Sequence, residues 1–245
     1  MDTLRNRIDL TNIPFTERGS RLLIFRKNHQ FAIRLAERWT KWESKVGHYR
    51  QRPPLITDFT FLNGAGEVVY DQTLETYPHV MQITNALGDF RCTFLDTETF
   101  LIRLPDGEYS FEFNVFVEKG TTDSRGGTFQ GKRNIAYTCD AELLSNSITN
   151  QGEENLKVRL SVRARSGDVL LLHITPRLAF NRSIPDSALV FERVRASWQA
   201  WFAAAPPVLD QYRSHYDYAW WVMRANLVSP RYYFTREAMF PSKVH

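Results

Sequence analysis

The stretch Leu156-Lys157-Val158-Arg159-Leu160-Ser161-Val162-Arg163-Ala164-Arg165 decides the fold class. Every second residue from Leu156 to Ala164 is apolar, and the residues between them are basic or polar. A period of two is typical of a strand with one face in a protein core and the other in water. After the turn at 166–168, the run 169–174 is apolar apart from His173 and predicts a strand buried on both faces. We expect His173 to be a hydrogen-bonded core residue.

Further strand-like runs precede this stretch, and each pair of runs flanks a turn rich in Gly, Asn or Asp. These residues tolerate positive φ angles, so they favour hairpins. In the run 108–117, Phe111, Phe113 and Val115 share one face. Turns at this spacing predict an antiparallel β-sandwich over residues 1–186. The paired runs are 21–25 with 31–35, 55–62 with 67–74 around Asn63-Gly64-Ala65-Gly66, and 99–104 with 108–117 around Pro105-Asp106-Gly107.

The hydrophobic period changes after Pro185. Apolar residues then recur every three or four positions, which predicts a linker helix over 187–203, capped by Asp186 or Ser187, within a linker segment 187–207. A second helix is predicted over 208–228, and we expect its apolar stripe to pack in a core. That stripe is Leu209, Tyr212, Tyr216, Ala219, Trp220, Met223 and Leu227.

Composition and charge exclude several classes of protein. The chain has 245 residues with 31 Lys and Arg against 27 Asp and Glu, a formal net charge of +4. Residues 1–50 carry +6 (11 Lys and Arg against 5 Asp and Glu) and the remaining residues −2, so the basic excess is local, and we expect no nucleic-acid partner. No apolar run approaches the roughly 20 residues that span a bilayer, and the first residues do not resemble a signal peptide. We therefore expect a cytoplasmic protein with no membrane partner.

Motifs for metal, phosphate or nucleophilic chemistry are incomplete. The string 126–132 satisfies G-x-x-x-x-G-K, but Arg133 follows it instead of Ser or Thr, and the next residues look extended rather than helical. We therefore interpret 119–134 as a mobile Gly-rich loop. The six histidines and the pair Cys92 and Cys139 show no metal-binding spacing, so no metal and no cofactor are expected.

The C-terminal residues carry a resemblance to a known group of enzymes. Tyr216-Asp217-Tyr218-Ala219-Trp220-Trp221 leads through Met223-Arg224-Ala225-Asn226-Leu227-Val228-Ser229-Pro230 to Arg236-Glu237-Ala238-Met239-Phe240-Pro241-Ser242-Lys243-Val244-His245. This resembles the entry to the catalytic barrel in glycoside hydrolases of the trehalase and processing α-glucosidase group, including family 63 and mannosylglycerate hydrolase-like proteins. The resemblance implies a mainly β chain: an N-terminal antiparallel β-sandwich, a linker helix, and the first helix of an incomplete six-hairpin α/α barrel over 208–245.

The same resemblance implies a function. The chain would be the N-terminal fragment of an inverting glycoside hydrolase acting on α-glucosides or related sugars, with the sandwich buttressing the barrel. The catalytic acid and base would lie beyond His245, so no residue here is assigned a catalytic role. Four residues would bind the oligosaccharide or glucoside substrate at the edge of the sugar pocket, and the loop 119–134 would reach over its entrance. They are Arg236, Glu237, Ser242 and Lys243.

An alternative remains open from the sequence, namely a stand-alone β-sandwich module that binds carbohydrate or protein. Sugar-binding modules stack pyranose rings on aromatic side chains. No tryptophan lies between residues 43 and 197, so such a site would depend on the tyrosines Tyr70, Tyr77, Tyr109 and Tyr137.

Overall fold

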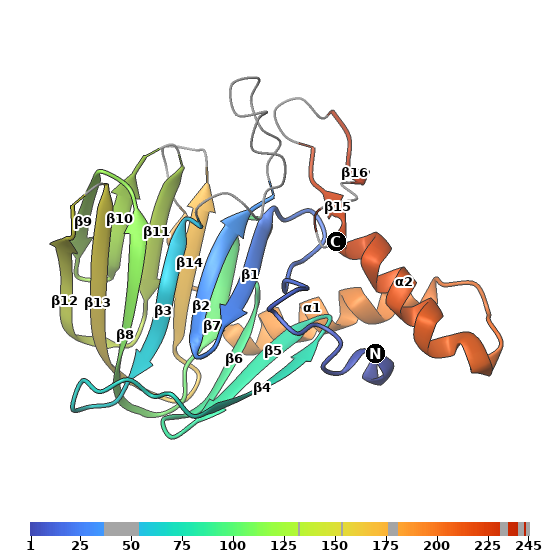
Figure 1. Ribbon diagram of the computed structural model, residues 1–245, viewed down its shortest axis with the longest axis horizontal. Helices are drawn as coiled ribbons and strands as arrows, with labels where there is room; N and C mark the ends of the chain where they lie inside the picture. The colour runs from blue at the N-terminus through green and yellow to red at the C-terminus, as the bar shows by residue number, and fades with distance from the viewer. Residues whose placement is uncertain are drawn as a thin grey trace.

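The chain forms two antiparallel sheets that pack face to face, with two α-helices at one side and end (Figure 1). The computed structural model describes residues 1–36, 54–131, 133–152, 154–175, 181–230, 235–239 and 243. Within these residues the protein is mainly β, as the strand pattern predicts.

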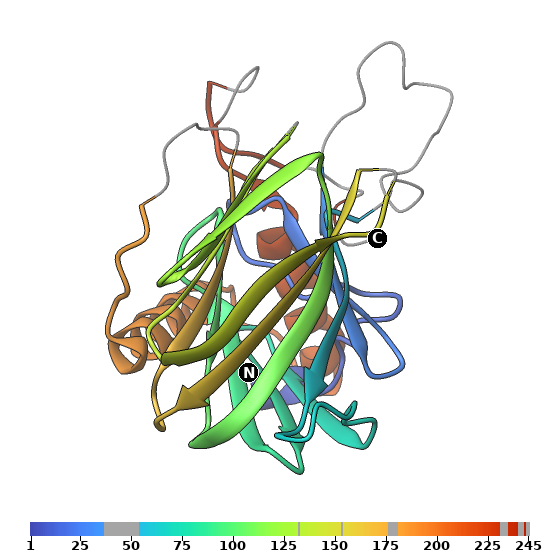
Figure 2. The same ribbon diagram turned by 90° about the vertical axis from the view of Figure 1, so that its left-hand side faces the viewer.

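The two large sheets have six and eight strands. The first has the order β1 (Leu22–Lys27), β2 (Gln30–Leu35), β3 (Ile56–Leu62), β8 (Gly107–Phe116), β13 (Asn155–Ala164) and β12 (Glu142–Asn150). The second has the order β4 (Gln72–Tyr77), β5 (Val80–Asn85), β6 (Gly88–Phe94), β7 (Thr99–Arg103), β14 (Val169–Thr175), β11 (Asn134–Cys139), β10 (Gly126–Gln130) and β9 (Lys119–Asp123). In Figure 2 the strands β12, β13 and β8 lie in front, and the helices lie behind them.

An aromatic core joins the sheets. Phe61 of β3 lies 4.6 Å from Phe90 of β6, measured between ring centroids, so these rings meet across the two sheets. Phe113 of β8 and Tyr137 of β11 meet in the same way at 5.7 Å. All four side chains are at most 1% exposed. Burial of aromatic side chains contributes about 2 to 3 kcal/mol each, so these contacts are a main source of sandwich stability.

The strand pattern that decides the fold class is confirmed. Along β13 the even-numbered residues from Leu156 to Ala164 are buried, while the basic residues between them face outward and pair with acidic neighbours such as Glu112. β14 is buried along nearly its whole length. Its His173 Nδ1 lies 2.7 Å from Thr99 Oγ1, which confirms the expected hydrogen-bonded histidine.

The hairpin predicted for 55–62 and 67–74 is confirmed only near its turn. Asn63 Oδ1 accepts hydrogen bonds from the backbone of Ala65 and Glu67, and Leu62 pairs with Val68. Beyond this point the chain leaves the six-stranded sheet, and β4 pairs with β5 in the other one. Local turn chemistry identifies the reversal, but the choice of sheet depends on packing that local sequence does not encode. The hairpin predicted for 99–104 with 108–117 is wrong for the same reason, because β7 and β8 lie in different sheets.

The interpretation of 119–134 as a mobile loop is wrong. β9 and β10 form a regular antiparallel hairpin there, and β10 continues the sheet through β11. The hairpin lies at the end of the sandwich opposite α2, so its position does not support a role over a pocket beside the C-terminal segment (Figure 1). The glycines permit close packing rather than mobility. A Cβ on Gly126 would lie 2.2 Å from the carbonyl oxygen of Tyr137.

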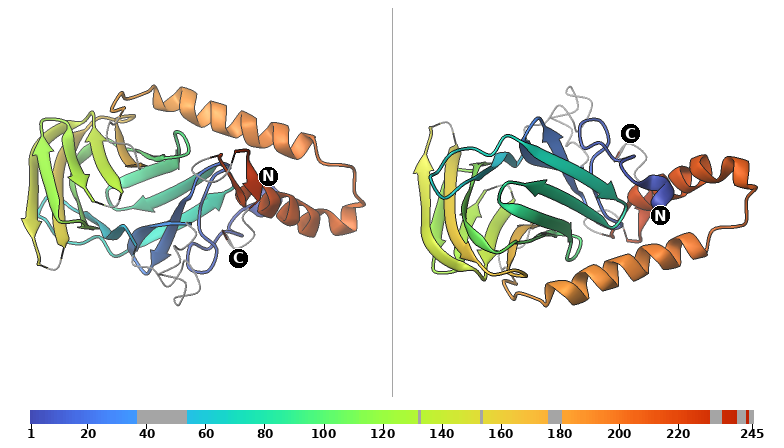
Figure 3. Two further views of the ribbon diagram at one scale, coloured as in Figure 1. Left: turned by 90° about the horizontal axis from the view of Figure 1, so that it is seen from above. Right: turned by 90° about the horizontal axis from the view of Figure 1, so that it is seen from below.

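The helix predicted over 187–203 is confirmed as α1 (Ser187–Ala203), while its role as a linker stays a prediction. The Asp186 carboxylate accepts a hydrogen bond of 2.9 Å from the Ala188 amide and caps its N-terminus. The helix runs along the outer face of the eight-stranded sheet and continues past it (Figure 3). Arg91 of β6 lies over the Phe191 ring, and Arg193 donates to the Leu95 carbonyl.

The second helix, α2 (Arg213–Ala225), folds back beside α1 after a 3₁₀ turn, Asp210–Tyr212 (Figure 3). Its buried residues are Trp221, Arg224 and Ala225. The predicted core stripe is only partly packed: Trp220 stacks on Trp201 of α1, but the exposed fractions are 68% for Leu209, 54% for Tyr212 and 40% for Met223. The packing expected for the stripe is therefore wrong for these three exposed residues.

The opposite face of α2 is buried because the N-terminal segment and α1 cover it. Thr3 donates a 2.8 Å hydrogen bond to Asp217, and the Arg7 guanidinium lies over the Tyr218 ring. A two-stranded sheet of β15 (Leu227–Val228) and β16 (Ala238–Met239) follows α2. In the described part of the chain, no helix combines the length and apolarity needed to cross a bilayer.

We predict that Gly126→Ala destabilises the protein by about 3 kcal/mol, because the new methyl group would overlap the Tyr137 backbone at a residue with φ +142°. Gly152→Ala is the matched control, since Gly152 also has positive φ (+85°) but its Cβ would meet nothing within 4 Å. That variant should cost only about 1 kcal/mol of backbone strain. Urea unfolding followed by circular dichroism measures both, and equal losses would contradict the packing role.

Candidate functional site

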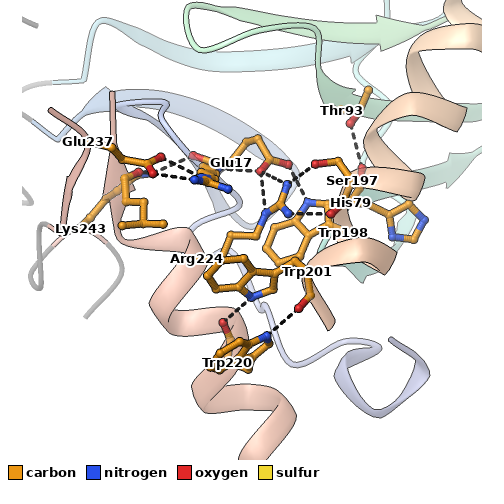
Figure 4. Close-up of polar contacts among 12 residues, drawn as sticks. Glu17, His79, Thr93, Ser197, Trp198, Trp201, Trp220, Arg224, Glu237 and Lys243 are labelled. Atoms are coloured by element: carbon orange, nitrogen blue, oxygen red, sulfur yellow. Dashed lines mark hydrogen bonds and ion pairs between the residues drawn. The ribbon is translucent and has the colours of Figure 1, made fainter. Parts of the chain in front are cut away.

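Glu17 lies at the centre of a polar cluster where the sandwich meets both helices (Figure 4). Its Oε2 accepts a 2.6 Å hydrogen bond from Trp198 Nε1 of α1, and its Oε1 accepts one of 3.1 Å from Arg224 Nη2 of α2. The two side-chain contacts thus join three parts of the chain that are far apart in the sequence.

Arg224 is almost completely buried, with 4% of its surface exposed. Besides Glu17, it donates to the carbonyl and hydroxyl oxygens of Ser197, each at 2.8 Å. Its guanidinium also lies 4.2 Å from the centroid of the Trp198 ring. A buried charge is tolerated only when it is paired and its donors are satisfied, and Arg224 meets both conditions.

A pair of tryptophans joins α1 to α2 next to this cluster. Trp201 Nε1 donates to the carbonyl oxygen of Trp220 at 3.0 Å, and Trp220 Nε1 donates to the carbonyl oxygen of Trp201 at 2.8 Å. The two rings stack with centroids 5.1 Å apart. The reciprocal bonds fix both the spacing and the register of the two helices.

The turn that carries Glu17 is also bonded to the chain after α2. The Gly19 amide donates to the Leu227 carbonyl at 2.9 Å, and the Ser229 amide donates to the Gly19 carbonyl at 3.0 Å. Gly19 has φ +79°, and a Cβ there would lie 2.5 Å from Ser229 Oγ, so glycine is required at this close approach. The N-terminal turn therefore positions β15 and, through it, β16.

Glu237 and Lys243 are the two predicted sugar-pocket residues that contact this turn. Glu237 forms a two-point ion pair with Arg18, in which Nε reaches Oε1 at 2.8 Å and Nη2 reaches Oε2 at 2.7 Å. Arg18 lowers the pKa of Glu237, so this side chain is a carboxylate at neutral pH. Arg236 is exposed beside it, and Ser242 lies outside the described residues.

Lys243 is fully buried rather than open to a ligand. Its Nζ donates to the carbonyl oxygens of Glu17 at 2.9 Å and Leu227 at 3.4 Å. Burial lowers its pKa to about 7, with Arg21 acting in the same direction and the Glu17 and Glu237 carboxylates opposing it. We assign Lys243 a structural role under the turn, and its contact with a sugar stays a prediction.

The tyrosines that a stand-alone sugar-binding module would need are mostly unsuitable. Tyr109 and Tyr137 are 2% and 1% exposed, and their hydroxyls donate to the Pro105 carbonyl and to Asn146. Their predicted part in sugar stacking is therefore wrong, because their rings belong to the core. Tyr77 is partly buried, while Tyr70 is 65% exposed and meets His29 edge to face.

Sequence reasoning missed Glu17, Arg18 and Arg224 as members of the site. Arg224 is 207 residues from Glu17, and Arg18 is 219 residues from Glu237. No local signal identified Arg224, because a lone arginine on an amphipathic helix ordinarily predicts a solvated cation.

Among the residues that the structure describes, no group of three or more His, Cys, Asp and Glu side chains could hold a metal ion. Cys92 and Cys139 are free thiols in the core, and burial raises the pKa of each. Neither thiol has the exposure or the low pKa that a nucleophile needs. The contacts around Glu17 are hydrogen bonds and a buried ion pair.

No known protein-family profile matches this chain, and a search of curated proteins finds no match to it.

We predict that Arg224→Leu destabilises the protein by about 3 kcal/mol, because it leaves the Glu17 carboxylate partly buried without its cation. Arg163→Leu is the control, since Arg163 pairs with Glu108 and Glu142 on the exposed face of the six-stranded sheet. It should leave the urea midpoint unchanged. Tryptophan fluorescence measures both transitions, and an unchanged midpoint for Arg224→Leu would contradict the central role of this pair.

We predict that Lys243 makes stability rise with pH between about 7 and 10.5. In this window the unfolded lysine, with its usual pKa of 10.5, holds a proton that the folded one has lost, so the free energy of unfolding increases by up to about 1.4 kcal/mol per pH unit. Lys243→Met should remove this rise. Lys157→Met, at an exposed ion pair with Glu112, should keep it. If the free energy of unfolding depends on pH in the same way for wild type and Lys243→Met, the lowered pKa of Lys243 is contradicted.

Proposed function

We propose that this chain supplies the β-sandwich and the first helices of an inverting glycoside hydrolase that acts on α-glucosides or related sugars. The observation that carries the proposal is the anchoring of Glu237 and Lys243 against the Glu17 turn, after a helical hairpin on which Tyr212 and Met223 are exposed. This arrangement combines a rigid sandwich, a linker helix and the segment whose sequence resembles the barrel entry in this group of enzymes.

The open face of α2 supports the helical part of the proposal. Tyr212 and Met223 have 54% and 40% of their surfaces exposed, whereas Trp220 on the same stripe is already covered by Trp201 of α1. Helices with wide apolar faces are stable when a neighbouring helix covers them. We propose that the next helix of an α/α barrel covers this one.

The charge state of Glu237 limits what it can do in such an enzyme. Inverting hydrolysis needs one protonated acid with a raised pKa and one base that activates water. Glu237 has a lowered pKa and is held by Arg18, so it does not fit the acid. Glu17 accepts hydrogen bonds from Arg224 and Trp198 at the junction. The proposal keeps Glu237 at the pocket edge and, as the resemblance implies, the two catalytic carboxylates outside these 245 residues.

The test compares residues 1–245 with the uninterrupted reading frame that contains them. Both are incubated with α-linked glucose disaccharides (trehalose, kojibiose, nigerose and maltose), and proton NMR follows the anomer released first. We expect the longer polypeptide to release the β-anomer and residues 1–245 to hydrolyse nothing. Retention of configuration, or no hydrolysis of any α-glucoside by a longer polypeptide that folds, would overturn the proposal. So would a reading frame without further helices.

A further inference from the structure

We infer that Glu237 accepts hydrogen bonds from neighbouring hydroxyl groups of an uncharged sugar, and that Arg18 of the sandwich is the residue that positions it. The inference rests on the proposed function and names the substrate class for the pocket edge. It assigns the N-terminal turn a part in recognition, beyond buttressing.

The geometry of the pair fixes the plane of the carboxylate. Two parallel bonds, Nε to Oε1 at 2.8 Å and Nη2 to Oε2 at 2.7 Å, leave Glu237 little freedom to rotate. Each oxygen has a second lone pair that Arg18 does not use. Glu237 retains 31% of its side-chain exposure and Arg18 44%, so the pair is open on one side. Two carboxylate oxygens held in this way suit a pair of adjacent hydroxyls.

Arg18 owes its own position to the junction described above. Its amide donates a 2.7 Å hydrogen bond to Glu17 Oε1, and its guanidinium lies 5.8 Å from the centroid of the Trp201 ring. Glu17 is held by Arg224, and Trp201 is held by Trp220. The side chain that orients Glu237 is therefore supported from both helices as well as from the sandwich.

The opposite charges of Arg18 and Glu237 favour an uncharged ligand. Arg18 keeps Glu237 ionised, and the two formal charges cancel. A neutral pair with open acceptor sites favours a polyol over an anion, since an anionic ligand would meet the carboxylate directly. A hydrogen bond from a hydroxyl to an ionised acceptor contributes more binding free energy than one to a neutral acceptor.

The test uses the longer polypeptide that contains this chain, with the uncharged glucose analogue 1,5-anhydroglucitol as the binding probe in calorimetry and the hydrolysed disaccharide for kinetics. Glu237→Gln should raise Kd and KM about tenfold with kcat nearly unchanged, because the carboxylate binds sugar without entering the reaction. Arg18→Gln should raise both about fivefold. Arg163→Gln, at the exposed pair with Glu108, should change neither.

The reversed pair, Arg18→Glu with Glu237→Arg, separates recognition from structure. Hydrogen exchange of residues 235–239 should return to the wild-type rate because an ion pair is restored, while Kd stays raised about tenfold because the acceptor is gone. Recovery of both would show a structural pair only and overturn the inference. If the reversed pair does not restore the wild-type exchange rate, the variant Arg18→Lys is the deciding test. Lysine keeps the positive charge but can donate only one of the two bonds to Glu237, so an unchanged Kd for the probe would overturn the inference.

The outcomes also distinguish this inference from the proposed function. A wild-type polypeptide that neither hydrolyses α-glucosides nor binds the probe overturns both. A wild-type enzyme that inverts α-glucosides, with Glu237→Gln retaining the wild-type Kd and KM, overturns the role of Glu237 and Arg18 alone.

Discussion

The buried ion pair between Glu17 and Arg224 is the constraint on which the arrangement of the helices depends. Arg224 is 4% exposed, and a guanidinium in that position must find a carboxylate and further acceptors. Arg224 donates hydrogen bonds to Glu17 on the N-terminal turn and to Ser197 on α1. The same carboxylate accepts the indole N–H of Trp198, so a single acidic side chain ties both helices to the sandwich.

Several other features follow from that pairing. With Arg224 and Trp221 turned inward, Tyr212 and Met223 lie on the exposed side of α2. The turn that presents Glu17 also carries Arg18, which holds Glu237, and the Glu17 carbonyl accepts a bond from buried Lys243. The C-terminal segment and the helical hairpin are thus ordered by one turn of the N-terminal chain.

Local patterns predicted much of the fold because they reflect local physics. The alternation along β13 and the cap at Asp186 were readable from side-chain period and capping chemistry. The hairpin of β9 and β10 is not predicted because its glycines suggest mobility, whereas Gly126 is needed for the close approach of the Tyr137 carbonyl. The face of α2 was misassigned because hydrophobicity alone does not reveal a buried arginine.

Residues close together in the chain are enough to predict the class of the fold and the position and length of α1, because side-chain period and capping are local. The sheet that each strand joins, the buried face of α2 and the surroundings of Glu237 follow from packing in the folded molecule. The last two depend on contacts between Glu17 and Arg224, and between Arg18 and Glu237, across more than 200 residues. No local period encodes a pairing at that separation, because it is selected by the burial and charge of the completed core.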